Sequence, residues 1–385
     1  MLFFEKVITR RNFLKILGTI TFTGSFFKDV IKNLTAKEFD RKIGLIISKP
    51  ALYYEKLPNR VVKCLLCPRM CVVPNGKKGF CRARKNINGE YYTLVHSNPC
   101  AVNNIDPIEK KPLFHFLPGT TVLSLATAGC NFTCKNCQNW DISQASPEDT
   151  DNIEVSPEQM VKLALEYKKP AIAYTYTEPS IFYEYMLDIA KIAHKNGVLN
   201  IYHSNGYLNQ EPLKELVKYL DGANVDLKGF SEDFYREITG GTLQPVLDTL
   251  KTLKKNGVWL EITNLVIPTK NDDEKMIKRM CEWIRDELGM EVPIHFSRFY
   301  PHYKLQNLPP TPIETLQKVA KIAKKVGLLF VYIGNVPGIK EESTFCPRCK
   351  KIIIERKGYS IQQINIENGK CKFCQTEIPG KWSLK

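Results

Sequence analysis

Residues 121–140 read TVLSLATAGCNFTCKNCQNW, and this stretch decides the fold that we expect for the 385-residue chain. Its first six residues, Thr121–Ala126, form an apolar run that predicts a buried β-strand. Cys130, Cys134 and Cys137 follow at C-x3-C-x2-C spacing, one thiolate short of the four that usually hold a cubane iron–sulfur cluster. Three protein ligands leave one iron open, and an open coordination position is where a metal carries out chemistry. A zinc loop can use similar gaps, so it is the place directly after a strand that favours a cluster at the mouth of a barrel.

The sequence alternates between apolar, β-rich runs and amphipathic helical patterns. The apolar runs lie at Thr121–Ala126, Ala171–Tyr176, Val198–His203, Ala223–Leu227, Trp259–Ile267 and Ile294–Phe299. The helical patterns lie at Pro157–Tyr167, Ser180–His194, Glu211–Leu220, Val246–Lys255, Asp273–Leu288 and Ile313–Val326. This alternation predicts an α/β fold with a parallel sheet, and six units fit a partial (β/α)6 barrel. A further run, Leu328–Ile333, predicts one more strand or a cover for the open edge.

Polar residues follow the second, third and fourth predicted strands. They are Glu178, the pair Ser204 and Asn205, and the pair Asp226 and Lys228. Functional residues of such barrels sit at the carboxyl ends of the strands, and residues two apart on a strand point to the same face. Each residue alone is better explained as a cap or a surface residue. Their order after the cysteine triad favours a shared site.

The triad spacing is the signature of the radical S-adenosylmethionine (SAM) superfamily, which this chain therefore resembles. The resemblance implies a [4Fe–4S] cluster on the triad and SAM bound at the open iron. It also implies reductive cleavage of SAM to a 5′-deoxyadenosyl radical. An aromatic residue usually precedes the third cysteine, whereas this chain has Asn136, which puts an aromatic contact to adenine at that point in doubt.

The resemblance also implies roles for the strand-end residues. Glu178 stands where a Gly-Gly-Glu-like turn holds the methionine amino group of SAM. Ser204 and Asn205 lie in a run similar to the ribose site of glycyl-radical activating enzymes, and they are expected to bind the ribose or the carboxylate. Asp226 and Lys228 match a pair that lies near SAM and substrate in those enzymes, so both are candidate catalytic residues, with Asp226 also a cofactor-binding candidate.

A wider set of motifs resembles the radical SAM member of the AmmeMemoRadiSam system, a relative of pyruvate formate-lyase-activating enzymes, over about residues 60–385. The motifs are CLLCPRMCVVPNGKKGFC (64–81), GCNFTCKNCQNWDISQ (129–144), YTYTEP (174–179), DLKGF (226–230), HFSRFYP (295–301) and YIGNVPG (332–338). This resemblance implies Memo-like and AMMECR-like partner proteins and a flavodoxin- or ferredoxin-like electron donor. The substrate stays unidentified.

Two alternative functions stay open. A glycyl-radical enzyme activase would act on a glycine of a partner protein. A zinc-dependent nucleic-acid-binding protein would contain no iron, and sparse basic and aromatic residues in the tail make it the weakest alternative, so nucleic acid is not an expected partner.

Two further cysteine groups flank the predicted barrel, among thirteen cysteines in all. The carboxy-terminal group, Cys346, Cys349, Cys371 and Cys374, consists of two C-x2-C pairs and predicts a structural zinc ribbon. The amino-terminal group, Cys64, Cys67, Cys71 and Cys81, follows C-x2-C-x3-C-x9-C. Its spacing fits zinc and an auxiliary iron–sulfur cluster equally well. Grouped cysteines indicate metal sites and a reducing compartment during loading.

The basic charge of the chain belongs to its amino-terminal part. Residues 1–100 carry 19 Lys and Arg against 6 Asp and Glu, whereas the rest carries 36 against 34. Thr9–Lys15 (TRRNFLK) precedes the apolar run Ile16–Phe27, which resembles a twin-arginine export signal. The alternative is an amphipathic amino-terminal helix. We expect folding and cofactor loading in the cytoplasm, with export or membrane contact only through this segment.

These observations predict four parts of the chain. They are a signal or helix at 1–35, a basic cysteine-rich module at 60–118, the partial barrel at 119–340 and a zinc-ribbon-like tail at 341–385.

Overall fold

The computed structural model describes residues 40–384, of which Arg41 onward belongs to one compact unit. The predicted export signal or helix at 1–35 lies outside the described residues. Among the residues that are described, none of the helices has the length and apolar character of a membrane span.

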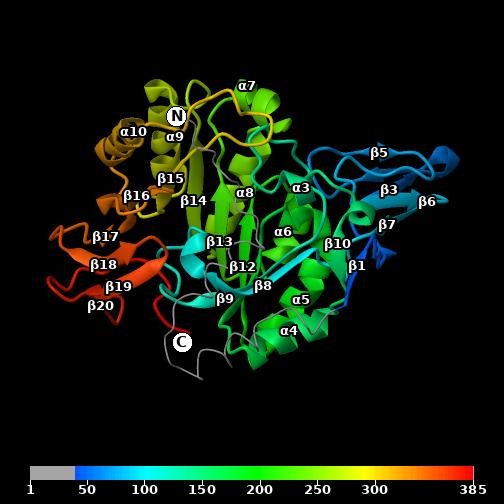
Figure 1. Cartoon of the computed structure of the whole chain (residues 1–385), viewed down its shortest axis with the longest axis horizontal. Helices are drawn as coiled ribbons and strands as arrows, with labels where there is room; N and C mark the ends of the chain where they lie inside the picture. Colours follow the sequence, from blue (N-terminus) through cyan, green and yellow to red (C-terminus); the bar gives the residue numbers. More distant parts are fainter. Residues whose placement is uncertain (1–39, 385) are drawn as a thin grey trace, which may run out of the picture. The chain divides into compact units, whose positions relative to one another are not determined.

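The centre of the fold is an eight-stranded sheet with the order β16-β15-β14-β13-β12-β11-β9-β8 (Figure 1). Seven neighbouring strands run parallel: β9 Thr121–Ala126, β11 Ala171–Tyr174, β12 Leu199–Ser204, β13 Gly222–Asp226, β14 Trp259–Val266, β15 Ile294–Arg298 and β16 Val331–Gly334. The six predicted strands and the additional seventh are therefore confirmed. The sheet ends at β16 and β8 and forms a partial barrel.

One strand of this sheet is missing from the sequence prediction. β8 (Ala101–Pro107) pairs antiparallel with β9 at the edge of the sheet, and its register is irregular between Asn103 and Asp106. An edge strand packs on fewer neighbours than a central one, so it needs no continuous apolar run.

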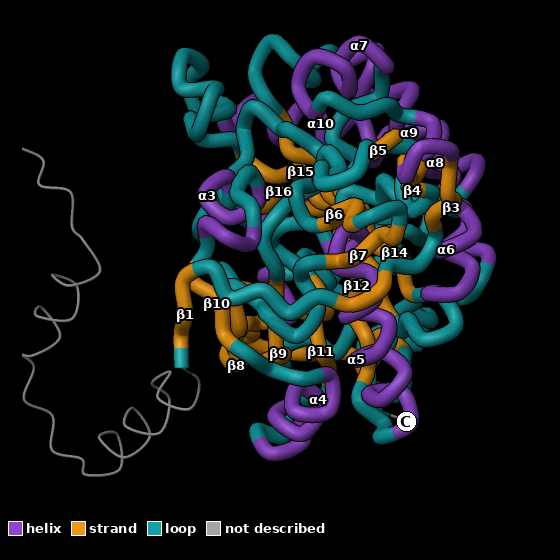
Figure 2. Tube along the Cα trace, turned by 90° about the vertical axis from the view of Figure 1, so that its right-hand side faces the viewer, coloured by secondary structure: helices purple, strands orange, loops and turns teal. Residues whose placement is uncertain are grey.

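Helices follow the strands, as the alternation predicted. The main ones are α4 Pro157–Glu166, α5 Tyr183–Lys195, α6 Gln210–Leu216, α8 Gln244–Lys255, α9 Glu274–Glu287 and α10 Ile313–Val326, and α3 Trp140–Ser143 and α7 Glu232–Phe234 are short. Short turns lie at η2 Pro58–Arg60, η3 Ile108–Lys110, η4 Pro147–Asp149, η5 Pro179–Phe182, η6 Tyr235–Thr239 and η7 Lys340–Glu342. Figure 2 shows α5, α6 and α8 beside the strands of the sheet. Ser156 and Gln159 form a reciprocal capping box ahead of α4, with Pro157 at its first position, which fixes where that helix begins.

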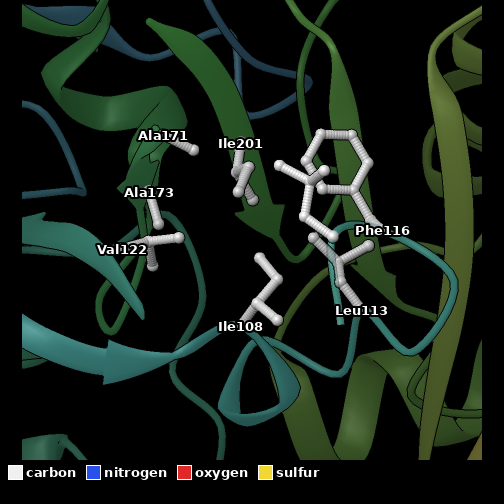
Figure 3. Close-up of a cluster of buried hydrophobic side chains, with 8 residues drawn as sticks. Ile108, Leu113, Phe116, Val122, Ala171, Ala173 and Ile201 are labelled. Atoms are coloured by element: carbon white, nitrogen blue, oxygen red, sulfur yellow. The ribbon is translucent and has the colours of Figure 1, made fainter. Parts of the chain in front are cut away.

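The segment from η3 to Leu117 packs against the amino-terminal half of the sheet. Ile108, Leu113 and Phe116 form a buried apolar cluster with residues of β9, β11 and β12 (Figure 3). Gly222 is the first residue of β13 and packs against the ring of Phe116. A Cβ at this position would lie only 2.8 Å from the ring, so a glycine is needed there. This segment fills the bottom of the partial barrel and leaves the carboxyl ends of the strands open.

Two small modules stand on opposite sides of the sheet (Figure 1). The amino-terminal module consists of β2 Lys49–Pro50, β3 Tyr54–Leu57, β4 Val61–Cys64, β5 Val72–Val73, β6 Arg84–Ile87 and β7 Glu90–Thr93, and β1 Arg41–Ile43 pairs with β10 Asp151–Ile153. The carboxy-terminal module consists of β17 Thr344–Phe345, β18 Ile352–Lys357, β19 Ser360–Ile364, β20 Ile366–Glu367 and β21 Lys370–Cys371. The buried Arg356 joins this second module to the barrel, because its Nη2 donates to the carbonyl of Phe114 at 2.7 Å.

Candidate active site

A cleft of about 420 Å³ lies at the carboxyl ends of the strands. Its walls bring together the cysteine triad and four of the five strand-end residues that the sequence singled out: Ser204, Asn205, Asp226 and Lys228. Glu178, the fifth, is fully buried and does not belong to the residues that line the cleft. Residues at the ends of β12 and β13 therefore converge on the triad, which itself follows β9, as expected for a barrel mouth.

The loop that carries the triad is held by backbone contacts to distant segments. The amides of Thr133 and Lys135 donate to the carbonyls of Thr239 and Ile238, at 2.8 and 2.9 Å. The amide of Phe132 donates to Cys130 Sγ at 3.4 Å, and the Ser143 hydroxyl lies 3.2 Å from Cys137 Sγ. Hydrogen bonds to sulfur are a main means by which a protein tunes a cluster.

The triad fits a cluster better than a single metal ion. Burial raises the pKa of Cys134 to about 12 and that of Cys130 well above its usual value, so these thiols need a metal to lose their protons. The sulfurs of one tetrahedral ion lie ~3.8 Å apart, as Zn–S bonds of ~2.3 Å require. In residues 40–384 the triad is not a group whose ligand atoms all lie within 4.8 Å of one another. A cubane needs the wider separation, because it lies between the sulfurs.

Glu178 organises the wall of the cleft from behind. Its Oε1 accepts from the amide of Ser180 at 2.9 Å and from the Ser204 hydroxyl at 2.7 Å. Its Oε2 accepts from the amide of Asn205 at 2.8 Å. Burial raises the pKa of Glu178, while these hydrogen bonds favour the carboxylate. Glu178 thus acts on the cleft through Ser204 and Asn205, two largely buried residues that line it.

Asn205 connects this wall to the triad loop. Its Nδ2 donates to Asn131 Oδ1 at 2.8 Å and lies 3.9 Å from Cys130 Sγ. Asn131 in turn donates to the carbonyl of Tyr207 at 2.8 Å. The side chain of Asn205 is therefore fixed beside the first cysteine.

A chain of polar side chains links the ends of β11, β12 and β13 at the cleft. Thr175 Oγ1 lies 3.1 Å from His203 Nδ1, His203 Nε2 lies 3.7 Å from Asp226 Oδ1, and Lys228 Nζ lies 2.7 Å from Asp226 Oδ2. Burial raises the pKa of Asp226, but Lys228 and His203 outweigh it and bring the pKa below its usual value. The predicted pair Asp226 and Lys228 is confirmed as an ion pair at the cleft.

Lys110, Lys111 and Tyr176 line the cleft and were not found from the sequence, nor was Asp106, which is buried behind them. Asp106 on β8 accepts from Lys110, Lys111 and the hydroxyl of Tyr176, which brings a strand edge and the turn after β11 together. Asp106 and Tyr176 are 70 positions apart, and no local pattern marks the pair.

Two more residues that line the cleft were not found from the sequence. Asn136 lines the cleft, and its Oδ1 is buried without a hydrogen-bond partner among the described residues. Tyr359, from the turn between β18 and β19, also lines it. The carboxy-terminal module therefore contributes to the cleft.

The carboxy-terminal cysteine group has the geometry of a site for one ion. The ligand atoms of Cys346, Cys349, Cys371 and Cys374 all lie within 4.8 Å of one another. Cys346 Sγ and Cys374 Sγ are 3.6 Å apart, and Cys349 Sγ and Cys371 Sγ are 3.8 Å apart. All thirteen cysteines are free thiols, which excludes disulfides between them in this structure.

A cleft that opens at the carboxyl ends of an open parallel barrel, beside two buried cysteines and one half-buried cysteine, defines a metal-dependent redox enzyme of the α/β class. The family model of the radical SAM superfamily matches residues 124–281. A protein of Methanocaldococcus jannaschii described as uncharacterised is 48% identical over 332 residues, which is 86% of this chain and 98% of that protein. The chain belongs to the radical SAM superfamily and is an enzyme, and the superfamily's fold implies a [4Fe–4S] cluster and SAM.

Similarity to activating enzymes is more limited. The pyruvate formate-lyase-activating enzyme of Clostridium pasteurianum is 25% identical over 123 residues, which is 29% of this chain and only 52% of that enzyme. A solved domain of a pyruvate-formate lyase-activating enzyme from Bacteroides vulgatus matches with a TM-score of 0.38 and 19% identity, over 42% of this chain and 98% of that domain.

Proposed function

We propose that this enzyme binds a [4Fe–4S] cluster on Cys130, Cys134 and Cys137 and cleaves SAM reductively at its open iron. When bound, the cluster and SAM supply a 5′-deoxyadenosyl radical, which takes a hydrogen atom from a substrate in the cleft. The observation that carries this proposal is the joint position of the three cysteines, Asn205 and Asp226 around one cleft. The substrate itself stays unidentified.

The protein's own residues would orient SAM and exclude water. Ser204 and Asn205 offer hydrogen bonds to the ribose or the carboxylate, and Glu178 holds both of them in place. The unpartnered Asn136 Oδ1 is available to accept an N–H of the adenine, in place of the usual aromatic contact. Asp226, held ionised by Lys228, places a charge next to the position of SAM and substrate.

The motif set described above supports assignment to the AmmeMemoRadiSam type, with Memo-like and AMMECR-like proteins as partners and a flavodoxin or ferredoxin as electron donor. A glycyl-radical activase is the second candidate, because the curated relatives at 25–26% identity are pyruvate formate-lyase-activating enzymes. A glycyl-radical signal in a partner protein after incubation with enzyme and SAM would favour this second candidate.

For the carboxy-terminal cysteine group we propose structural zinc. Four thiolates at the measured separations match the ~3.8 Å spacing of a tetrahedral zinc site. A closed site of four sulfurs has no open position for chemistry, so the ion would stabilise the module that places Tyr359 at the cleft.

The test is an anaerobic assay of reconstituted protein with dithionite and SAM, with 5′-deoxyadenosine as the product measured. Wild type and Cys281→Ala should form it, and Cys134→Ala should not. Cys281 is the matched control, because it is a buried thiol in α9 outside the three cysteine groups. Electron paramagnetic resonance (EPR) of the reduced cluster should change when SAM is added. A full, reducible cluster that shows neither this change nor the product would refute the proposal.

A further inference from the structure

The amino-terminal cysteine group converges on one place in the module that precedes the barrel. The amide of Cys64 donates to the carbonyl of Cys71 at 2.9 Å, which closes the loop between them. Cys67 interacts electrostatically with Cys64, Cys71 and Cys81, so the four thiols lie near one another. None of them is engaged in a disulfide.

The separation of the four sulfurs distinguishes this group from the carboxy-terminal one. Within residues 40–384, only the carboxy-terminal group brings three or more ligand atoms within 4.8 Å of one another. No three of the amino-terminal sulfurs therefore lie as close together as the ligands of one zinc ion do. Sulfurs that surround a cubane stand farther apart than the ligands of one zinc ion, since the cluster's own atoms occupy the space between them.

Buried donors without partners surround the same group. Arg84 and Tyr91 are each 1% exposed, and Arg84 Nε and the Tyr91 hydroxyl have no hydrogen-bond partner among the described residues. Both lie within electrostatic reach of Cys64 and Cys81, and a Cβ on Gly79, in the loop between Cys71 and Cys81, would lie 2.6 Å from the Tyr91 hydroxyl. Arg84 uses its Nη2 on both oxygens of Glu184, at 2.7 and 2.6 Å, and this pair fixes the direction of the free Nε. Buried donors left unpaired destabilise a folded protein, unless an acceptor that is absent from the protein chain satisfies them.

We propose that Cys64, Cys67, Cys71 and Cys81 bind a second [4Fe–4S] cluster, whose sulfur atoms accept hydrogen bonds from Arg84 and Tyr91. Four protein ligands leave no open iron, so this cluster carries electrons and does not bind SAM.

The second site lies directly against the loop of the triad. A Cβ built on Gly129, the residue before Cys130, would lie 2.3 Å from the carbonyl oxygen of Cys81. Arg69, between the second and third cysteines of the group, donates through Nε to the carbonyl of Asn131 at 2.5 Å. A low-potential one-electron carrier would reduce the second cluster by one electron, and passage of that electron to the triad's cluster would restore the second cluster to its oxidised state. This relay role rests on the proposed function of the triad, whereas the identity of the metal does not.

The experiment measures iron, sulfide and zinc in anaerobically reconstituted protein in which Cys130, Cys134 and Cys137 are all replaced by alanine. We expect about four iron, four sulfide and one zinc per chain in this variant, against about eight iron and one zinc in wild type. Reduced variant should give the EPR signal of a [4Fe–4S] cluster that does not respond to SAM. Two zinc ions and no iron in the variant would overturn the proposal and leave the function of the triad untouched.

A second variant guards against loss of folding in the first. Cys67→Ala with Cys81→Ala should lower the iron of the protein by half and leave the SAM-responsive EPR signal. Wild-type protein that contains only about four iron and two zinc ions would refute the second cluster independently of either variant. Tyr91→Phe in the triad variant should keep the iron and lower the midpoint potential, because it removes a hydrogen bond to cluster sulfur. An unchanged potential would show that Tyr91 does not face the cluster.

Discussion

Replacement of Glu178 by glutamine tests whether a buried carboxylate builds the wall of the cleft. The carboxylate accepts from two backbone amides, those of Ser180 and Asn205, which bind different oxygens, and from the Ser204 hydroxyl. A glutamine amide has only one oxygen, so its NH2 group must face one of the two amides. The Ser204 hydroxyl can rotate, but a backbone N–H cannot. One buried N–H therefore loses its acceptor, at a cost of about 1–3 kcal/mol.

The assay is anaerobic urea unfolding of the reconstituted protein at pH 7, followed by circular dichroism. The Glu178→Gln variant should lose about 1–3 kcal/mol of unfolding free energy. The EPR titration with SAM should show weaker binding, because Asn205 and Ser204 move. Glu314→Gln is the matched control at an exposed position of α10, where the same chemical change should cost only a few tenths of a kcal/mol.

Two results would contradict this reasoning. If Glu178→Gln unfolded at the same urea concentration as wild type, the carboxylate would not be the acceptor that the two amides depend on. If stability fell and SAM affinity stayed unchanged, Ser204 and Asn205 would not be the groups that bind SAM.

Three further perturbations have outcomes that the structure sets. Lys228→Met should destabilise the protein by about 1–3 kcal/mol, since it leaves Asp226 half-desolvated without its cation, and Asp226→Asn added to it should recover part of the loss in the same urea assay. Burial raises the pKa of Asp106, but Lys111 and Tyr176 outweigh it and bring the pKa to about 2. The ionised Asp106 therefore adds about 2 kcal/mol to the free energy of unfolding above pH 4, and this stabilisation disappears as the pH falls toward 2. Asp106→Asn should accordingly be less stable than wild type at pH 7, and urea curves from pH 7 to pH 3 should show the difference shrinking below pH 4; a constant difference would rule out this ionisation. Cys374→Ser should remove the zinc and leave the iron content unchanged, as measured by metal analysis. Once a substrate is known, steady-state kinetics should show that the variant's KM rises more than its kcat falls, because Tyr359 loses its support.

The sequence predicted the sheet because parallel strands are buried on both faces. Thr121–Ala126 is an almost continuous apolar run, and the structure has β9 at the same residues. The later strands were predicted to within a few residues for the same reason. β8 was not predicted, because its residues Asn103 and Asp106 are polar and its pairing with β9 is irregular. The sequence thus shows which strands are central more readily than which strand closes an edge.

Some residues of the candidate active site could likewise be predicted from the sequence, and others could not. Ser204, Asn205, Asp226 and Lys228 could be found because the carboxyl ends of successive parallel strands meet at one edge, and strand order alone places them there. The direction of Glu178 could not be found, because three donors from two segments decide which way its carboxylate points. Pairs such as Asp106 and Tyr176 depend on the path of a whole strand, which spacing does not describe.

The shape of the triad loop is likewise a tertiary property. The spacing of its cysteines is local, but its backbone is held by Arg69 from the amino-terminal module and by Thr239 and Ile238 after β13. The Asn131 side chain adds a hydrogen bond to the carbonyl of Tyr207 after β12. Damage to the amino-terminal cysteine group would therefore lower activity through Arg69, even if that group held no iron and the triad kept its cluster and its SAM-responsive EPR signal. Loss of activity after substitution of an amino-terminal cysteine cannot separate an electron carrier from a brace, whereas the metal retained when the triad itself is removed can.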